Sequence, residues 1–147
     1  MSGWKRICCP VDFSETSRVA LETSAGLAKR EGAELALVYV LEMPAAVAEF
    51  PMLPAEFLEQ TTREVEKKLE RWRSEAEGLR GGPVRAEVVS GSPAGEIVRH
   101  ARAGGFDLLV VGTHGRTGIR HLVLGSVAER VIREAHCAVL VVRRPAK

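Results

Sequence analysis

A spaced set of glycines with a serine at its end is the clearest chemical signal in this sequence. Gly112 and Gly115 are followed, after nine intervening residues, by Gly125 and Ser126. Glycine lets backbone N–H groups approach a phosphate closely, because it has no Cβ atom. A helix beginning at Ser126 would add unpaired N–H groups and a dipole that both favour an anion. The pattern predicts a phosphate site, and the alternative is an ordinary surface loop with glycine turns.

The residues between these glycines add positive charge and no acid. Four side chains add possible phosphate donors: Arg116, Arg120, His114 and His121. The two histidines are interpreted as solvated loop residues and not as catalytic or metal-binding groups. The stretch 113–124 contains no Asp or Glu. Phosphoryl transfer needs a held Mg²⁺ ion and a positioned base. The stretch therefore favours binding a phosphate over transferring one.

Two better-known nucleotide loops are excluded by their missing residues. The P-loop pattern ends in Gly-Lys-Ser/Thr, and no lysine precedes Ser126. The dinucleotide fingerprint would occupy the turn after the first strand, but residues 10–14 read PVDFS and contain no glycine. Any nucleotide site here is of another kind.

Strand and helix patterns alternate along the chain, which predicts an α/β domain with a parallel sheet. Five apolar runs are predicted to be strands: Ile7–Val11, Leu35–Leu41, Val84–Val89, Leu108–Val111 and Ala138–Val142. Four helices are predicted, after Ser14, from near Ala55, after Ser92 and from the Gly125–Val127 region.

Helical periodicity also predicts which side chains of two helices face the core. In the second helix these are Leu58, Thr61, Val65, Leu69, Trp72, Ala76 and Leu79, and in the last they are Val127, Ala128, Val131, Ile132 and Ala135. The face of the second helix could instead be a coiled-coil seam for a partner. The segment 42–54, with three prolines, is expected to be a long loop, serving as a lid, a contact surface or neither.

Length and composition limit the classes of function. The 147 residues fit one domain spanning 1–147, with 46% hydrophobic and 27% charged residues. A net charge of +2 predicts no general attraction to nucleic acid. The sequence contains no run of 18 apolar residues, so no membrane helix is predicted. None of the three cysteines belongs to a metal-binding motif. We therefore expect a cytoplasmic protein with reduced, buried thiols, among them Cys137.

The glycine pattern resembles the G-2x-G-9x-G-[S/T] motif of ATP-binding universal stress proteins. The resemblance extends over nearly the whole chain. Residues 10–14 (PVDFS) are similar to that family's first turn, and residues 33–40 to its second strand. Residues 125–129 (GSVAE) and 139–142 (VLVV) are similar to its C-terminal end. Ala138 departs from the proline common there, which should affect only the entry to the strand.

The resemblance implies a doubly wound, Rossmann-like domain with strand order 3-2-1-4-5. Ligands bind such sheets where the order reverses, beyond the carboxyl ends of the strands. By resemblance, Pro10, Val11, Asp12 and Val40 would border adenine and ribose, and Gly112, Gly115, Arg116, Gly125, Ser126 and Val127 would hold ribose and phosphates. Asp12 could also cap the first helix, a role compatible with ligand binding.

The function implied is an ATP-binding regulatory module of the stress response that senses or stores nucleotide. The ligand would be ATP, possibly with Mg²⁺, and ADP or AMP could replace it. The resemblance also implies a homodimer through the strand Ala138–Val142. Two alternatives stay open: an ATP-consuming enzyme, either a slow ATPase or an adenylating enzyme of related architecture, and a nucleotide-free dimerisation scaffold. The adenylating enzymes need a glycine- and serine-rich loop after the first strand, where this chain has Asp12-Phe13-Ser14.

Overall fold

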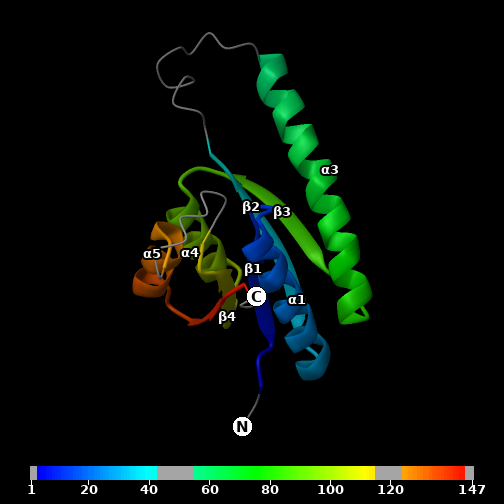
Figure 1. The fold of residues 1–147 in the computed structure, drawn as a ribbon, viewed down its shortest axis with the longest axis vertical. Coiled ribbons are helices and arrows are strands. Elements are labelled where there is room, and N and C mark those ends of the chain that lie inside the picture. The colour runs from blue at the N-terminus through cyan, green and yellow to red at the C-terminus, as the bar shows by residue number, and fades with distance from the viewer. Residues whose placement is uncertain (1–2, 43–54, 115–123, 145–147) are drawn as a thin grey trace.

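The computed structural model describes residues 3–42, 55–114 and 124–144. Its strands are β1 (Arg6–Pro10), β2 (Glu34–Leu41), β3 (Arg85–Ser90), β4 (Leu108–Gly112) and β5 (Ala138–Val142). Its helices are α1 (Glu15–Glu31), α3 (Ala55–Arg80), α4 (Pro93–Ala103) and α5 (Ser126–Glu134). The five strands form one parallel sheet of order β3-β2-β1-β4-β5 (Figure 1). The predicted α/β fold and strand order are confirmed.

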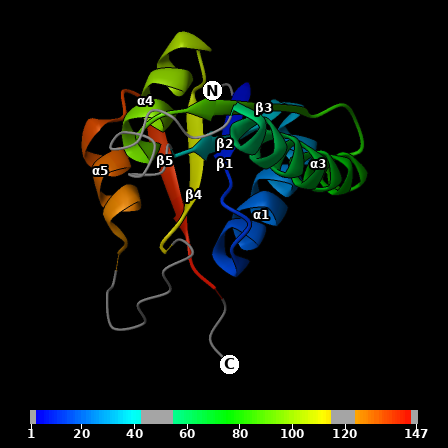
Figure 2. The ribbon, with the colours of Figure 1, turned by 90° about the horizontal axis from the view of Figure 1, so that it is seen from above.

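Helices cover both faces of the sheet. Helices α1 and α3 lie on one side, and α4 and α5 lie on the other (Figure 2). The central strand β1 therefore contributes to two cores, with Ile7 and Cys9 facing one and Cys8 the other. Burial on both faces explains why β1, β2 and β4 read as continuous apolar runs instead of alternating ones.

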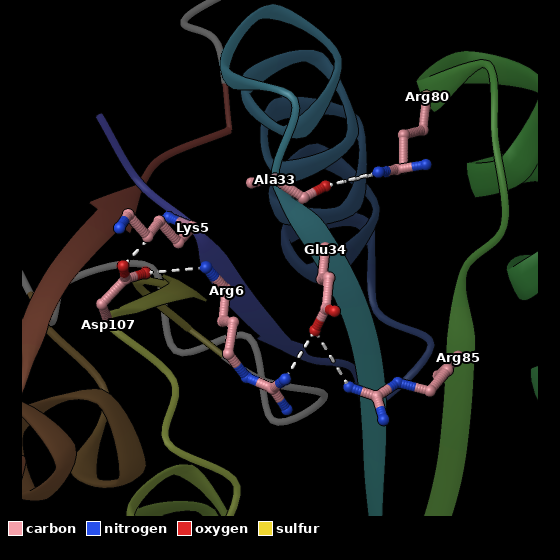
Figure 3. A network of polar contacts seen from close by, with 7 residues as sticks. All are labelled: Lys5, Arg6, Ala33, Glu34, Arg80, Arg85 and Asp107. Carbon is pink, nitrogen blue, oxygen red and sulfur yellow. Dashed lines mark hydrogen bonds and ion pairs between the residues drawn. The ribbon is translucent and has the colours of Figure 1, made fainter. Parts of the chain in front are cut away.

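The amino ends of the strands are tied together by charged groups (Figure 3). The Asp107 carboxylate accepts hydrogen bonds from the backbone N–H groups of Lys5 and Arg6, at 2.9 and 3.0 Å. Glu34 pairs with Arg6 at 2.6 Å and with Arg85 at 3.4 Å. Because exposed ion pairs add little stability, we interpret this network as fixing the alignment of four neighbouring strands. It occupies the end of the sheet opposite the predicted site.

Helix α3 matches its predicted beginning but buries less of its apolar face than predicted. Leu69, Trp72 and Ala76 are buried, so about two turns supply the whole buried stripe. The prediction is wrong for Leu79, whose side chain is 48% exposed. The first turns of α3 extend past the sheet (Figure 1), which leaves little for them to pack against.

Helix α5 also has a narrower buried face than its sequence indicates. Ala128 and Val131 are buried. The prediction is wrong for Val127 and Ile132, which are 39% and 44% exposed. With only nine residues, the helix presents one short stripe to the sheet, and side chains beside that stripe meet solvent.

Candidate functional site

A cavity of about 330 Å³ opens at the carboxyl ends of β1, β2 and β4. The strand order reverses here, because the chain continues from β1 to β2 on one side and from β4 to β5 on the other. Such a switch point is where open α/β sheets bind ligands. The structure brings eight of the ten predicted site residues to this cavity: Pro10, Val11, Asp12, Val40, Gly112, Gly125, Ser126 and Val127. Gly115 and Arg116 lie outside the described residues.

The turn after β1 carries Asp12, whose carboxylate lies on the side of the cavity next to β1. The Asp12 Oδ1 atom accepts a hydrogen bond from the Ser14 N–H at 3.0 Å, and the Asp12 N–H donates to Ser17 Oγ at 3.3 Å. Ser14 is the residue that caps helix α1, with its Oγ accepting from the Ser17 N–H at 3.2 Å. The alternative role of Asp12 as the cap is therefore wrong. Asp12 instead lines the cavity with one carboxylate oxygen held by the backbone.

Helix α5 begins at the opposite wall of the cavity. Gly125 occupies the N-cap position, with no side-chain hydrogen bond at the cap. Its N–H donates to the Thr113 carbonyl at 2.6 Å, which places the start of the helix beside the end of β4. The first N–H groups of an α-helix have no acceptor within the helix. Here they belong to Ser126, Val127 and Ala128, which all line the cavity.

Close packing explains why glycine occupies positions 112 and 125. A Cβ atom at Gly112 would lie 2.6 Å from Thr16 Cγ2, on helix α1. A Cβ atom at Gly125 would lie 3.0 Å from the Thr113 carbonyl oxygen. The φ angle of Gly125 is −72°, so this position does not require a left-handed backbone. Both glycines bring the strand and helix ends together around the cavity.

Sequence reasoning missed a second carboxylate. Glu42 lines the cavity directly after β2. The predicted loop 42–54 includes Glu42, although the position of Glu42 at the end of a buried parallel strand is the signal that identifies it. His114, a donor predicted near the phosphate, also lines the cavity and is half-buried. The other wall residues not predicted are Ser17, Val38, Pro93, Ile97, Val111, Thr113 and Ala128.

The cysteines are not arranged for chemistry. Burial raises the pKa of the Cys9 thiol to about 12 and raises the pKa of Cys8 as well. Cys137 is only half-buried, so its prediction as a buried thiol is wrong. Within the described ranges, no group of three or more His, Cys, Asp or Glu side chains could hold a metal ion. Nor is any helix there long and apolar enough to cross a membrane.

The sequence as a whole matches a known family. The model of the universal stress protein family matches residues 3–143. This chain belongs to the universal stress protein family. It is 39% identical to the universal stress protein MJ0531 of Methanocaldococcus jannaschii over 152 residues, which cover 98% of this chain and 85% of the relative. The family resemblance found in the sequence is confirmed.

Solved structures of similar proteins share this universal stress protein's fold. The structure of MJ0577 from the same archaeon superposes with a TM-score of 0.86 at 33% identity, covering 98% of this chain and 99% of that one. A universal stress protein solved with cAMP matches with a TM-score of 0.74 at 24% identity, covering 98% and 100%. One from Archaeoglobus fulgidus, solved with dAMP, matches with a TM-score of 0.68 at 22% identity, covering 96% and 98%.

Proposed function

We propose that this universal stress protein binds ATP in the cavity at the switch point and acts as a cytoplasmic regulatory module. The carrying observation is that two chemically different walls share one cavity. Asp12 stands at one wall, and the N-terminus of α5 stands at the other. Carboxylates accept hydrogen bonds from sugar hydroxyl groups, and helix N-termini favour phosphate. A nucleoside phosphate has both groups in one molecule.

The complexes of related proteins support an adenine nucleotide as the ligand. The proteins solved with cAMP and with dAMP have this fold and belong to this family. ATP is proposed over AMP because of the resemblance of the glycine pattern to the ATP-binding motif of the family. Competition binding experiments with ATP, ADP and AMP, with and without Mg²⁺, rank the affinities of the protein for the three nucleotides. Mass spectrometry of nucleotide extracted from the purified protein identifies the one held in the cell.

Turnover of ATP is expected to be slow, which favours the binding module over an ATP-consuming enzyme. The described carboxylates of the cavity, Asp12 and Glu42, follow β1 and β2, whereas α5 starts beside the end of β4. The wall proposed for phosphate thus has no acid among the described residues. Enzymes commonly turn over at about 1–1,000 per second. Sustained phosphate release at about 1 per second or faster from pure protein would contradict the proposal.

Calorimetric titration of variants with ATP and adenosine tests the site. A hydrogen bond to a charged group contributes about 1.5–3 kcal/mol. Ser126→Ala is therefore expected to lower the affinity for ATP about 10- to 100-fold. Gly125→Val should weaken ATP more, because its Cβ would crowd the Thr113 carbonyl at 3.0 Å and displace the helix start. Both variants should change adenosine binding little.

A variant at the other wall completes this test. Asp12→Ala should weaken adenosine and ATP alike, since the carboxylate is proposed to contact the nucleoside. Ser74→Ala, on the exposed side of α3, is the matched control and should bind both ligands like wild type. If Gly125→Val binds ATP as tightly as wild type, the phosphate assignment is wrong. If the protein is purified without bound nucleotide and has no measurable affinity for ATP, the result would favour the nucleotide-free dimerisation scaffold.

A further inference from the structure

The backbone of Phe13 adopts a conformation that its residue type disfavours. Its φ angle is 67°, and it is the one non-glycine residue with positive φ among residues 3–42, 55–114 and 124–144. A left-handed backbone brings Cβ close to the carbonyl oxygen, and a bulky side chain gains no local hydrogen bond in return. Such strain persists only where surrounding contacts impose it, often at functional sites. Phe13 directly follows Asp12, at the edge of the cavity.

The Phe13 ring belongs to an aromatic cluster with Tyr39 and Trp72. The Phe13 ring stacks on Tyr39 of β2, with centroids 4.8 Å apart and planes 19° apart. It meets Trp72 of α3 edge-on, with centroids 5.2 Å apart. The Lys68 Nζ atom lies 5.1 Å from the centre of the Phe13 ring, within the range of a cation–π interaction. The ring is thus held by two separate elements.

Helix α1 braces the same cluster through a second cation. The Arg18 guanidinium lies 4.5 Å from the centre of the Trp72 ring and pairs with Glu75. Trp72 is therefore held between Phe13 and a side chain of α1. Both Tyr39 and Trp72 are buried, at 5% and 6% exposure, which gives the cluster a fixed position.

Phe13 lies within the hydrogen-bonded turn that presents Asp12 to the cavity. The hydrogen bond from the Ser14 N–H to Asp12 Oδ1 spans Phe13, so its geometry depends on the Phe13 backbone. Rotation of Phe13 to negative φ would turn the Ser14 N–H relative to the carboxylate. We infer that Phe13 is a positioning residue: the aromatic cluster holds its left-handed backbone, which fixes the Asp12 carboxylate in the cavity. This inference rests on the proposed nucleotide site.

Helix α3 thereby takes part in nucleotide binding from outside the cavity. No described residue of α3 lines the cavity, yet α3 supplies Trp72 and Lys68 to the cluster. Displacement of α3 would remove the contacts that stabilise Phe13 in its conformation. Nucleotide affinity would then fall without any change in the residues that contact the ligand.

Substitutions at Phe13 separate this role from simple core packing. Phe13→Tyr keeps the ring and should bind adenosine and ATP within about twofold of wild type. Phe13→Gly removes the ring but tolerates positive φ, and Phe13→Ala removes the ring while its Cβ opposes that conformation. We expect affinity to fall in the order Tyr, Gly, Ala. The loss in Phe13→Ala should reach at most that of Asp12→Ala, about 10- to 100-fold. A purely packing role predicts the opposite order for Gly and Ala, because glycine leaves the larger void.

A double-mutant cycle and a stability control complete the test. If Phe13 acts through Asp12, the double variant Asp12→Ala, Phe13→Ala binds no more weakly than Asp12→Ala alone. Leu35→Ala truncates the same core at the opposite end of β2 and should lower thermal stability without changing nucleotide affinity. Where Phe13→Ala does not fold, the comparison of Phe13→Leu with Phe13→Gly replaces it.

The outcomes distinguish this inference from the proposed function. Three outcomes would overturn the positioning role and leave the nucleotide site intact. Phe13→Ala could bind nucleotide like wild type, Phe13→Gly could bind more weakly than Phe13→Ala, or the losses of affinity in the double-mutant cycle could be additive. Wild-type protein that binds neither ATP nor adenosine overturns both. The positioning role is supported if affinity falls in the order Phe13→Tyr, Phe13→Gly, Phe13→Ala and the double-mutant cycle is non-additive.

Discussion

Two separate structural requirements favour glycine at position 112: close approach to a ligand and close packing against helix α1. In the sequence it reads as the first glycine of a phosphate loop. In the structure it lines the cavity, and it also lies so close to Thr16 of α1 that a side chain would not fit. The residue type alone does not separate these two reasons, because both require the absence of a Cβ atom.

Gly112→Ala is expected to destabilise the domain. Its Cβ would lie 2.6 Å from Thr16 Cγ2, so α1 or β4 must shift. Overpacking of this kind costs about 1–3 kcal/mol. Urea unfolding followed by circular dichroism measures the loss. The double variant Gly112→Ala, Thr16→Ser removes the nearest methyl group and should recover part of the stability. A Gly112→Ala protein as stable as wild type would show that the contact relaxes without cost.

The elements were predictable because most of them carry simple signals. Each predicted strand lies within one residue of an observed one at either end, since buried parallel strands read as unbroken apolar runs. A helix was predicted to begin after Ser14, and Ser14 caps α1 in the structure. The faces of α3 and α5 were less predictable. Periodicity shows which side chains share a face, but how much of that face is covered depends on neighbouring elements.

The site was predictable wherever a motif defines it, and less so where packing does. Eight predicted residues meet in one cavity because they lie at the carboxyl ends of β1, β2 and β4 or at the start of α5. Glu42 was missed because the apolar loop after it concealed its place at a strand end. The left-handed backbone of Phe13 was not predictable at all. Phenylalanine disfavours that conformation, and contacts distant in the sequence impose it.

The buried thiols of β1 predict a loss of stability at high pH. Burial raises the pKa of Cys9 from its ordinary value of 9.0 to about 12. Between these values the unfolded chain releases the thiol proton and the folded chain keeps it. The unfolded state then binds fewer protons, so stability falls as pH rises, by up to about 1.4 kcal/mol per pH unit per thiol.

Urea unfolding from pH 8 to 11 tests this linkage with Cys9→Ala. The variant lacks the titrating group, so its stability should decline less steeply than that of wild type above pH 9. The difference between the two curves isolates the contribution of Cys9, because both proteins share every other ionisable group. Cys137→Ala removes a half-buried thiol, whose pKa burial also raises, and is the comparison for the fully buried Cys9. Parallel curves for wild type and Cys9→Ala would contradict a raised pKa at Cys9.

At the scale of the whole molecule, the two edges of the sheet differ in character. Edge strand β3 carries Arg85 and Glu87, and Arg85 pairs with Glu34 of β2. Edge strand β5 reads AVLVV and carries no charge. Charged side chains on an edge strand discourage pairing with another chain, and their absence permits it. The sheet is thus protected at β3 and open to association at β5.

We therefore propose that this universal stress protein forms a homodimer through β5. A closed dimer of this kind is two-fold, so each protomer contributes the same strand. Leu140 is the middle residue of β5 and is 38% exposed in the single chain. Leu140→Lys would place two positive charges near the two-fold axis, where like charges on facing strands repel. The variant should dissociate at concentrations at which wild type is a dimer, with its fold unchanged.

Sedimentation velocity at micromolar concentration, over a range of salt, measures this effect. Wild type should sediment as a dimer, and Leu140→Lys should shift toward monomer most strongly at low salt, where charge repulsion is least screened. Leu140→Met replaces the side chain with one of similar volume and no charge, and should remain dimeric. Arg85→Ala at the opposite edge should leave the mass unchanged. A monomeric wild type would contradict the dimer. A dimer lost with Arg85→Ala instead of Leu140→Lys would place the association elsewhere than β5.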